Sequence, residues 1–426
     1  MLVSRVWRWW VVGWVLAAGA AAQATLPAHS GSAVEWSLGG VSFVSADRAN
    51  VLQLGALVQG DGRFALAVPA SAPPPGWTQA FLFRRVRPIL QGRFDRRFEF
   101  SFVPDFAPGQ MAVNAASISV RIFPHLALII GKAHAPVRLK YTAPSASLRF
   151  PERSLVSDLE PASDVGVQVE GSAAAGGLSY EAGVFNGAND GTSGGFAHFG
   201  AHQLDARITA EPFLHDRREW WRDLGFALGG TRGTASGSLP VFKSFSQAKF
   251  FSYARGASAD GTRWRLTPAV FLYHRAFAAF ADYARSGQAV RGPSGFAAVN
   301  DLQHQAWAAT ALVVVTGESE GARGVVPRYA FDPVRGHWGA LELALRHGQL
   351  SLDPRVSALG LAAPGASRTA SASGVAADWY LSLDLKAVLA FERTVFDGGP
   401  QGPRPPEHAL IYGLQISLTP SLPALR

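Results

Sequence analysis

The 426-residue chain contains no cysteine, and only 16% of its residues are charged. The absence of cysteine excludes disulfide bonds and thiolate metal sites. Soluble domains carry about 25% charged residues, so this chain is poor in charge. Beyond residue 24 it also lacks any apolar run near the ~20 residues that a membrane-spanning helix needs. This combination suits a protein that exposes a thin apolar band to lipid.

The first 24 residues predict a secretory signal peptide that is removed from the mature protein. Arg5 and Arg8 form a basic start, residues 9–18 form a short apolar core, and small residues at 20–24 fit a cleavage site. An N-terminal membrane helix is the alternative, but the apolar stretch is short for a span. The mature chain is therefore expected to be exported. Residues 25–50 would lead into a domain at 51–418, and residues 419–426 would form a C-terminal tail.

Apolar and polar residues alternate with a period of two along most of the chain, and helical periodicity is scarce. Examples are residues 92–102 (GRFDRRFEFSF), 204–210 (LDARITA), 341–346 (LELALR), 378–386 (DWYLSLDLK) and 410–418 (LIYGLQISL). Such alternation indicates β-strands with two unlike faces. Roughly sixteen segments of this kind are separated by turn-rich loops, and their ~10-residue length is that of tilted membrane strands.

Alternation alone does not show which face lies inside. An exported soluble β-protein that binds a ligand would bury its apolar face, whereas a membrane barrel turns that face to lipid and must close on itself. Ionised residues at many strand positions favour the barrel. So do Trp264, Trp307, Trp379 and Tyr412, which lie on the apolar faces and fit interfacial aromatic girdles. The phenylalanines of residues 92–102 are then expected to face lipid, and the charged residues of that segment to face a water-filled lumen.

Several segments resemble the phosphate-selective porins O and P of bacterial outer membranes. Residues 128–136 (LIIGKAHAP) resemble a family strand that ends in Gly-Gln/Lys and a proline, and residues 149–155 (RFPERSL) resemble its Phe-x-Glu-Arg-x-Leu segment. Further matches follow in the family's order at residues 183–187, 315–318, 324–327, 331–333, 338–346 and 391–399. The resemblance covers roughly residues 50 to 418.

The resemblance implies an all-β fold, a transmembrane antiparallel up-and-down barrel of about 16 strands. It also implies a homotrimer in the outer membrane, a third loop folded inward to narrow the pore, and passive uptake of phosphate or related anions along Arg and Lys side chains. Two departures stand out. Arg138 and Lys140 occupy positions where the family often has Gly and Glu, and the chain ends without the usual terminal aromatic residue.

Two groups of cations are candidate anion sites. Fixed cations in a narrow pore focus the electric field and concentrate anions. The predicted constriction consists of Lys132, Arg138, Lys140, Arg149 and Arg153. The predicted pore wall consists of Arg85, Arg87, Arg93, Arg97 and Arg121. The alternatives are a solvated surface loop for the first group and cross-strand ion pairs that stiffen the barrel for the second.

The sequence offers little support for chemistry or for other ligands. It contains no His-Glu-x-x-His zinc pattern and no Walker-type phosphate loop, so no catalytic residue, metal or cofactor is predicted. The pI near 10.0 would suit nucleic acid, but no recognition helix or stacking module accompanies it. A passive anion channel is the leading hypothesis. A non-selective porin, a barrel-based hydrolase and a soluble β-rich binding protein remain as alternatives.

Overall fold

A computed structural model provides the structure of the chain. It describes residues 32–37, 39–66, 80–107, 109, 111–138, 144–195, 202–216, 220–293, 299–322, 324–399 and 404–419. The predicted signal peptide, residues 1–24, lies outside the described residues. So does the predicted tail, except for Thr419.

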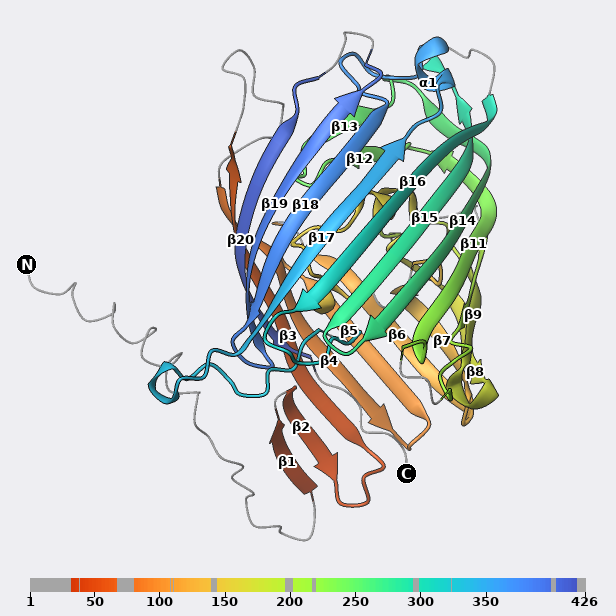
Figure 1. Cartoon of the computed structure of the whole chain (residues 1–426). Coiled ribbons are helices and arrows are strands. Elements are labelled where there is room, and N and C mark those ends of the chain that lie inside the picture. The colour runs from red at the N-terminus through yellow and green to blue at the C-terminus, as the bar shows by residue number, and fades with distance from the viewer. Residues whose placement is uncertain are drawn as a thin grey trace, which may run out of the picture.

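Sixteen antiparallel strands of the described part form a closed barrel (Figure 1). Each strand pairs with its neighbours, and β20 returns to pair with β3 from Leu418↔Ala56 to Ala409↔Ala65. The predicted fold class is confirmed. The strands are β3 Val51–Ala65, β4 Ala80–Phe94, β5 Phe98–Asp105, β6 Ala112–Phe123, β7 Leu126–His134, β8 Ser163–Ala173, β9 Leu178–Phe185, β10 Gln203–Ala210, β11 Asp223–Gly237, β14 Ser258–His274, β15 Phe277–Arg291, β16 Val299–Val314, β17 Ala340–Ser351, β18 Thr369–Tyr380, β19 Leu385–Asp397 and β20 Glu407–Leu418.

A short hairpin precedes the barrel. It consists of β1 (Ser32–Ser37) and β2 (Gly40–Ser45). β2 pairs with the first residues of β3, from Val44↔Val51 to Val41↔Leu54, where β20 no longer reaches. The hairpin therefore extends the wall below one end of the barrel (Figure 1).

The apolar faces of the strands point outward, as predicted. On β17, Leu343 and Leu345 are 41% and 60% exposed, whereas Glu342 between its apolar neighbours is 0% exposed. β20 repeats the pattern, with Tyr412 exposed outside and Gln415 buried inside. Because lipid covers the outer wall, this is the arrangement that avoids placing charges in hydrocarbon.

Two segments that alternation predicts as single strands are hairpins. Residues 92–102 comprise the end of β4, a turn at Asp95–Arg97 and the start of β5. Residues 378–386 likewise turn between Tyr380 and Leu385. Residues opposite each other in a hairpin share a face, and the partners Phe94 and Phe98 are an even number of positions apart. Alternation therefore continues through the turn, which hides it in the sequence.

One end of the barrel carries tight turns, and the other carries the longer loops. β6 and β7 are joined by two residues, and β14 and β15 by another two. In outer-membrane barrels the short turns face the periplasm and the longer loops face outward. The 25-residue connection between β16 and β17 is a long exception at the short-turn end. It contains the 3₁₀ turn η5 (Pro333–Arg335).

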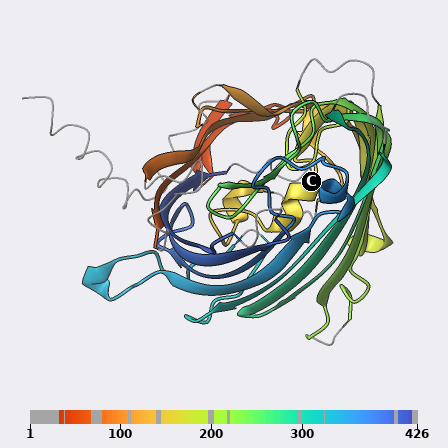
Figure 2. The ribbon, with the colours of Figure 1, turned by 90° about the horizontal axis from the view of Figure 1, so that it is seen from above.

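The third long loop comprises residues 135–162 between β7 and β8, and its described residues, 135–138 and 144–162, fold into the lumen as the resemblance implied. We refer to it as the constriction loop. It contains the 3₁₀ turns η1 (Ser145–Ser147) and η2 (Leu155–Leu159), which lie within the ring of strands in Figure 2. Two further short helical segments, η3 (Ala174–Gly176) and α1 (Arg355–Ala358), lie at the barrel ends.

A second segment, which was not predicted from the sequence, also fills the lumen. Between β11 and β14 the chain forms a small hairpin of β12 (Val241–Lys243) and β13 (Lys249–Ser252). Phe242, Phe250 and Phe251 of this hairpin pack with Leu155 and Leu159 of the constriction loop in one apolar cluster. Inward residues of β15 to β19, among them Leu302, Leu350 and Phe396, and apolar residues of the β17–β18 connection complete the cluster. Part of the predicted water-filled lumen is therefore a packed apolar core.

Candidate functional site

The constriction loop is fastened at its tip by a buried cluster of charges. The Arg149 guanidinium donates to the Glu320 carboxylate and to the Gly321 carbonyl oxygen, 2.6 Å away. Arg149 Nε lies 3.6 Å from Glu342 Oε1, and both carboxylate side chains are 0% exposed. Lys386 Nζ donates to the Leu148 carbonyl oxygen at 2.6 Å. Strand residues and the β16–β17 connection thus hold the loop from below.

Polar side chains of the wall hold the rest of the loop backbone. Gln415 Nε2 donates to the Ala146 carbonyl oxygen at 2.9 Å, and Gln59 Nε2 to that of Ser145 at 3.3 Å. Arg346 Nη1 donates to the Glu152 carbonyl oxygen at 2.9 Å, and its guanidinium lies 4.0 Å above the Phe150 ring. The loop is therefore placed by specific contacts on several strands.

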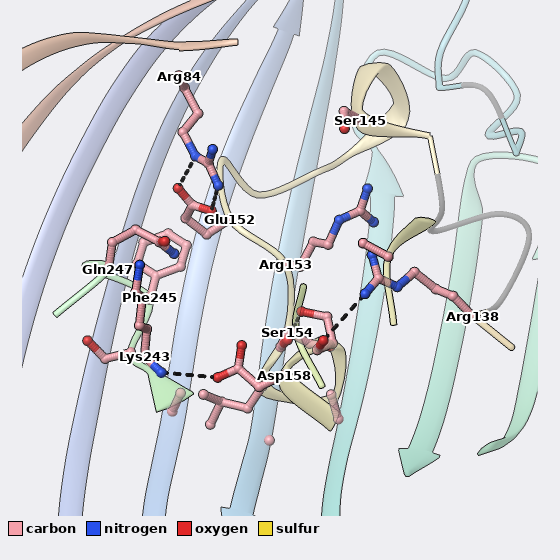
Figure 3. A pocket seen from close by; sticks show the side chains of 18 of the residues that line it. Arg84, Arg138, Ser145, Glu152, Arg153, Ser154, Asp158, Lys243, Phe245 and Gln247 are labelled. Atoms are coloured by element: carbon pink, nitrogen blue, oxygen red, sulfur yellow. Dashed lines mark hydrogen bonds and ion pairs between the residues drawn. The ribbon is translucent and has the colours of Figure 1, made fainter. Parts of the chain in front are cut away.

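A polar cavity of about 220 Å³ remains beside the constriction loop (Figure 3). Its lining includes three carboxylates, Glu152, Asp158 and Glu392. Cations outnumber them. The seven cationic side chains in the lining are Arg84, Arg85, Arg87, Arg138, Arg153, Lys243 and Arg346. They come from β4, the constriction loop, the β12–β13 hairpin and β17, so separate parts of the chain converge on one space.

Glu152 neutralises part of this positive charge. Arg84 binds its carboxylate through two bonds of 2.6 and 2.9 Å, and Arg63 adds a third contact of 2.6 Å. Burial alone would raise the pKa of Glu152, but the neighbouring guanidiniums outweigh burial and lower the pKa to about 2. The carboxylate is therefore ionised at any physiological pH.

The carboxylate of Asp158, at the other end of the cavity in Figure 3, is not bound by guanidinium groups of the described residues as that of Glu152 is. Its Oδ2 accepts a bond from the backbone N–H of Lys243 at 3.3 Å. Burial raises the pKa of Asp158 to about 7 and outweighs the stabilising effects of Lys243 and Arg138. The charge of the cavity therefore changes near neutral pH.

The predicted constriction residues do not form one group. Arg138 and Arg153 line the cavity. Arg149 instead lines a smaller neighbouring cavity of about 70 Å³ and fastens the loop tip. Lys132 is buried on β7 and donates to the Gly194 carbonyl oxygen at 2.5 Å. Lys140 lies outside the described residues.

The predicted wall residues also separate. Arg85 and Arg87 line the cavity, and Arg87 pairs with Asp105 at 2.7 Å. Arg93 binds Glu99 across the β4–β5 hairpin at 2.8 Å, and Arg121 lies 3.5 Å from the same carboxylate. For these two the ion-pair alternative describes the geometry better. The fifth predicted wall residue, Arg97, lies in the turn and is exposed, so it belongs to no strand row of the wall.

Three cavity cations were not identified as site residues from the sequence. Arg346 alternates with the outward leucines of β17, so its inward position could have been predicted from the sequence. Arg84 is the residue left unpaired by the register shift opposite Gln59 and Gly60, and it lines the cavity beside Arg85. Such bulges leave no clear trace in a single sequence. Lys243 depends on the β12–β13 hairpin folding into the lumen.

Within the described ranges, no helix is long and apolar enough to cross a membrane. Nor does any group of three or more His, Cys, Asp or Glu side chains have the geometry to hold a metal ion.

Comparisons with known proteins agree with this architecture. No curated protein sequence matches the chain. Among solved structures, the outer membrane channel DcaP of Acinetobacter baumannii is similar with a TM-score of 0.54 at 10% identity, covering 86% of this chain and 97% of that one. A loop-deletion mutant of OmpT, an outer membrane protein of Vibrio cholerae, has a TM-score of 0.50 at 10% identity, covering 86% and 99%. At such low identity these matches establish the fold alone.

The family comparison covers the segment that builds the site. Residues 74–210 match the model of the phosphate-selective porin O and P family. This range contains β4 to β10 and the whole constriction loop, so it includes five of the seven cavity cations. The chain therefore has the fold of outer-membrane porins, and its residues 74–210 carry the sequence pattern of the phosphate-selective porin O and P family.

Proposed function

We propose that the protein is a passive outer-membrane channel that prefers small anions, phosphate or related oxyanions among them. The observation that carries the proposal is the excess of cations in the lumen cavity. Seven basic side chains and three carboxylates line it, and two further carboxylates just outside the lining, Asp105 and Glu160, pair with Arg87 and Arg138. Fixed charge of one sign in a confined space raises the local concentration of the opposite ion. Guanidinium groups also bind oxyanions through paired hydrogen bonds.

No chemical step belongs to this function. Anions enter by diffusion, are concentrated by the basic lining and leave down their gradient. The family match and the porin fold support passive transport. A homotrimer, implied by the resemblance, is part of the proposal, and the molar mass of the protein–detergent complex measured by light scattering tests it.

The selectivity proposal is tested in planar bilayers under a gradient of potassium chloride. The sign and size of the reversal potential give the ratio of anion to cation permeability. A unit charge ~6 Å from a passing ion contributes about 0.7 kcal/mol at the dielectric constant of water, which is about a threefold change in that ratio. Arg153→Gln and Lys243→Gln should each lower the anion preference by about this factor.

Arg291→Gln is the matched control. Arg291 pairs with Asp260 on the outer surface, where the two side chains are 58% and 42% exposed. Its loss should leave selectivity unchanged. A cation-selective or unselective wild-type pore would overturn the anion proposal and favour a general porin. Replacing chloride by phosphate on one side then shows whether oxyanions are preferred.

A further inference from the structure

A polar row crosses four strands on the outer wall of the barrel. Register places His347 of β17 opposite Ser373 of β18, Ser373 opposite Arg393 of β19, and Arg393 opposite His408 of β20. His347, Ser373 and Arg393 are exposed, and all four residues alternate with buried inward neighbours. Such a concentration of polar groups is unexpected on a face that lipid covers.

The row lies at the upper edge of the apolar band. The next outward row toward the short-turn end is fully apolar, with Leu345, Val375, Phe391 and Leu410 on the same four strands. On the side of the long loops, Trp307 packs against the His347 ring at a centroid distance of 5.3 Å. A tryptophan at this height marks the membrane–water interface, so the polar row lies at the level of lipid headgroups.

An apolar groove of about 830 Å³ lies beside and below the row. Its floor on β15 and β16 consists of four alanines, Ala279, Ala281, Ala309 and Ala311. Larger side chains flank the floor, namely Val270 and Leu272 on β14 and Leu345 on β17. His347, Ser373 and Arg393 are also among the groove's lining residues. A hydrocarbon-shaped space thus opens directly onto a polar edge.

Arg393 supplies a fixed positive charge at that edge. Within the described part of the chain, no carboxylate forms an ion pair with it. Its cross-strand neighbours offer hydrogen-bonding groups: the Ser373 hydroxyl, which lies 2.7 Å from His347 Nδ1, and the His408 ring. A guanidinium flanked by a hydroxyl and imidazoles is suited to a phosphate group.

We propose that this face binds one molecule of lipid A, the phosphorylated lipid of the outer leaflet, with a phosphate at Arg393 and an acyl chain in the alanine groove. The inference rests on the proposed outer-membrane location, since the row faces the leaflet on the side of the long loops. Charge complementarity and continuity with the lipid-facing band both favour a lipid over a second protein chain.

Native mass spectrometry of the purified protein in detergent tests the proposal with diphosphoryl lipid A as the probe. Arg393→Gln should weaken binding about tenfold, because it removes a charge-assisted contact. Ala281→Leu together with Ala309→Leu should weaken it similarly by filling the groove. Arg232→Gln is the matched control, since Arg232 is also exposed on the outer wall, opposite Trp264, but is not part of the groove. Heat-modifiable migration on a gel checks that each variant folds.

Four results would overturn the proposal. The first is equal lipid A binding by the Arg393 and Arg232 variants. The second is equal binding of lipid A and phosphatidylcholine. The third is phosphatidylglycerol binding as tightly as lipid A, which would remove the assignment to the outer-leaflet lipid. The fourth is a change of oligomeric state in the groove variants, which would show that a second copy covers this face. Ion selectivity recorded in phosphatidylcholine bilayers depends on the lumen alone, so failure of the channel proposal is seen separately.

Discussion

Replacing Arg149 by Gln should destabilise the protein far more than its position in a loop suggests. The Arg149 side chain is 7% exposed, and its partners Glu320 and Glu342 are 0% exposed. Removing one member of a buried ion pair leaves an uncompensated charge and costs about 3–5 kcal/mol. The unfolding entropy of a chain of this length converts that loss to a fall of about 3–6 °C in Tm.

The same substitution should also change the open channel. Arg149 holds the tip of the constriction loop, so the variant should show larger current fluctuations in single-channel recordings. Arg291→Gln is the control, because its exposed pair with Asp260 contributes only about 0–1 kcal/mol. If the two variants melt at the same temperature and conduct with the same noise, the buried cluster does not fasten the loop and the reasoning is wrong.

Three further predictions concern the lumen. Glu152→Gln should raise the anion permeability ratio about threefold, because it removes one of three carboxylates; an unchanged reversal potential would contradict this. Anion preference should be greater at pH 6 than at pH 8, because Asp158, with a pKa of about 7, is neutral below that pH and negative above it. Asp158→Asn should remove this pH dependence of the reversal potential. If the pH dependence persists in the variant, Asp158 is not its cause. Phe242→Ala removes a fully buried ring, which should lower the free energy of unfolding by about 3–5 kcal/mol. Because the change releases the β12–β13 hairpin, mean conductance should increase. Unchanged conductance would show that the hairpin does not limit the pore.

The orientation of the wall could be predicted because the two faces of each strand differ so strongly. Along β17, leucines alternate with Glu342, Ala344 and Arg346, and only one assignment keeps the charges out of lipid. Strand ends were harder to predict. Phe94 and Phe98 are partners across a turn, yet their spacing continues the alternation, so no break in the pattern marks Asp95–Arg97.

The site was predictable only where it follows the strand pattern or the family motif. Arg85 and Arg87 were named from alternation, and Arg138 and Arg153 from the cluster of cations between residues 132 and 153, where Arg138 departs from the family pattern. The inward turn of Arg84 depends on a local register shift opposite Gln59 and Gly60. Such a shift is set by packing among neighbouring strands, which a single sequence does not display.

Loops that fold into the lumen pose a different problem. Phe242, Phe250 and Phe251 form an apolar group in a segment between two strands, and the sequence does not say where that group is buried. In the structure they cover Leu155 and Leu159 of the constriction loop. These residues are buried because two loops that are far apart in the chain pack against each other, and no local pattern of apolar residues predicts such a contact.

The arginines of the lumen have two roles that compete: they form ion pairs that hold the structure together, and they attract anions. Arg84 and Arg346 are ion-paired to Glu152 and Glu392, and these contacts help to hold the constriction loop and the wall together. Each such pair removes one positive charge from the attraction that a passing anion feels. A pore of this design therefore depends on the surplus of cations over carboxylates, and that surplus is what substitutions at Glu152 and Arg153 change in opposite directions. If both substitutions shifted the reversal potential in the same direction, the net charge of the cavity would not control selectivity.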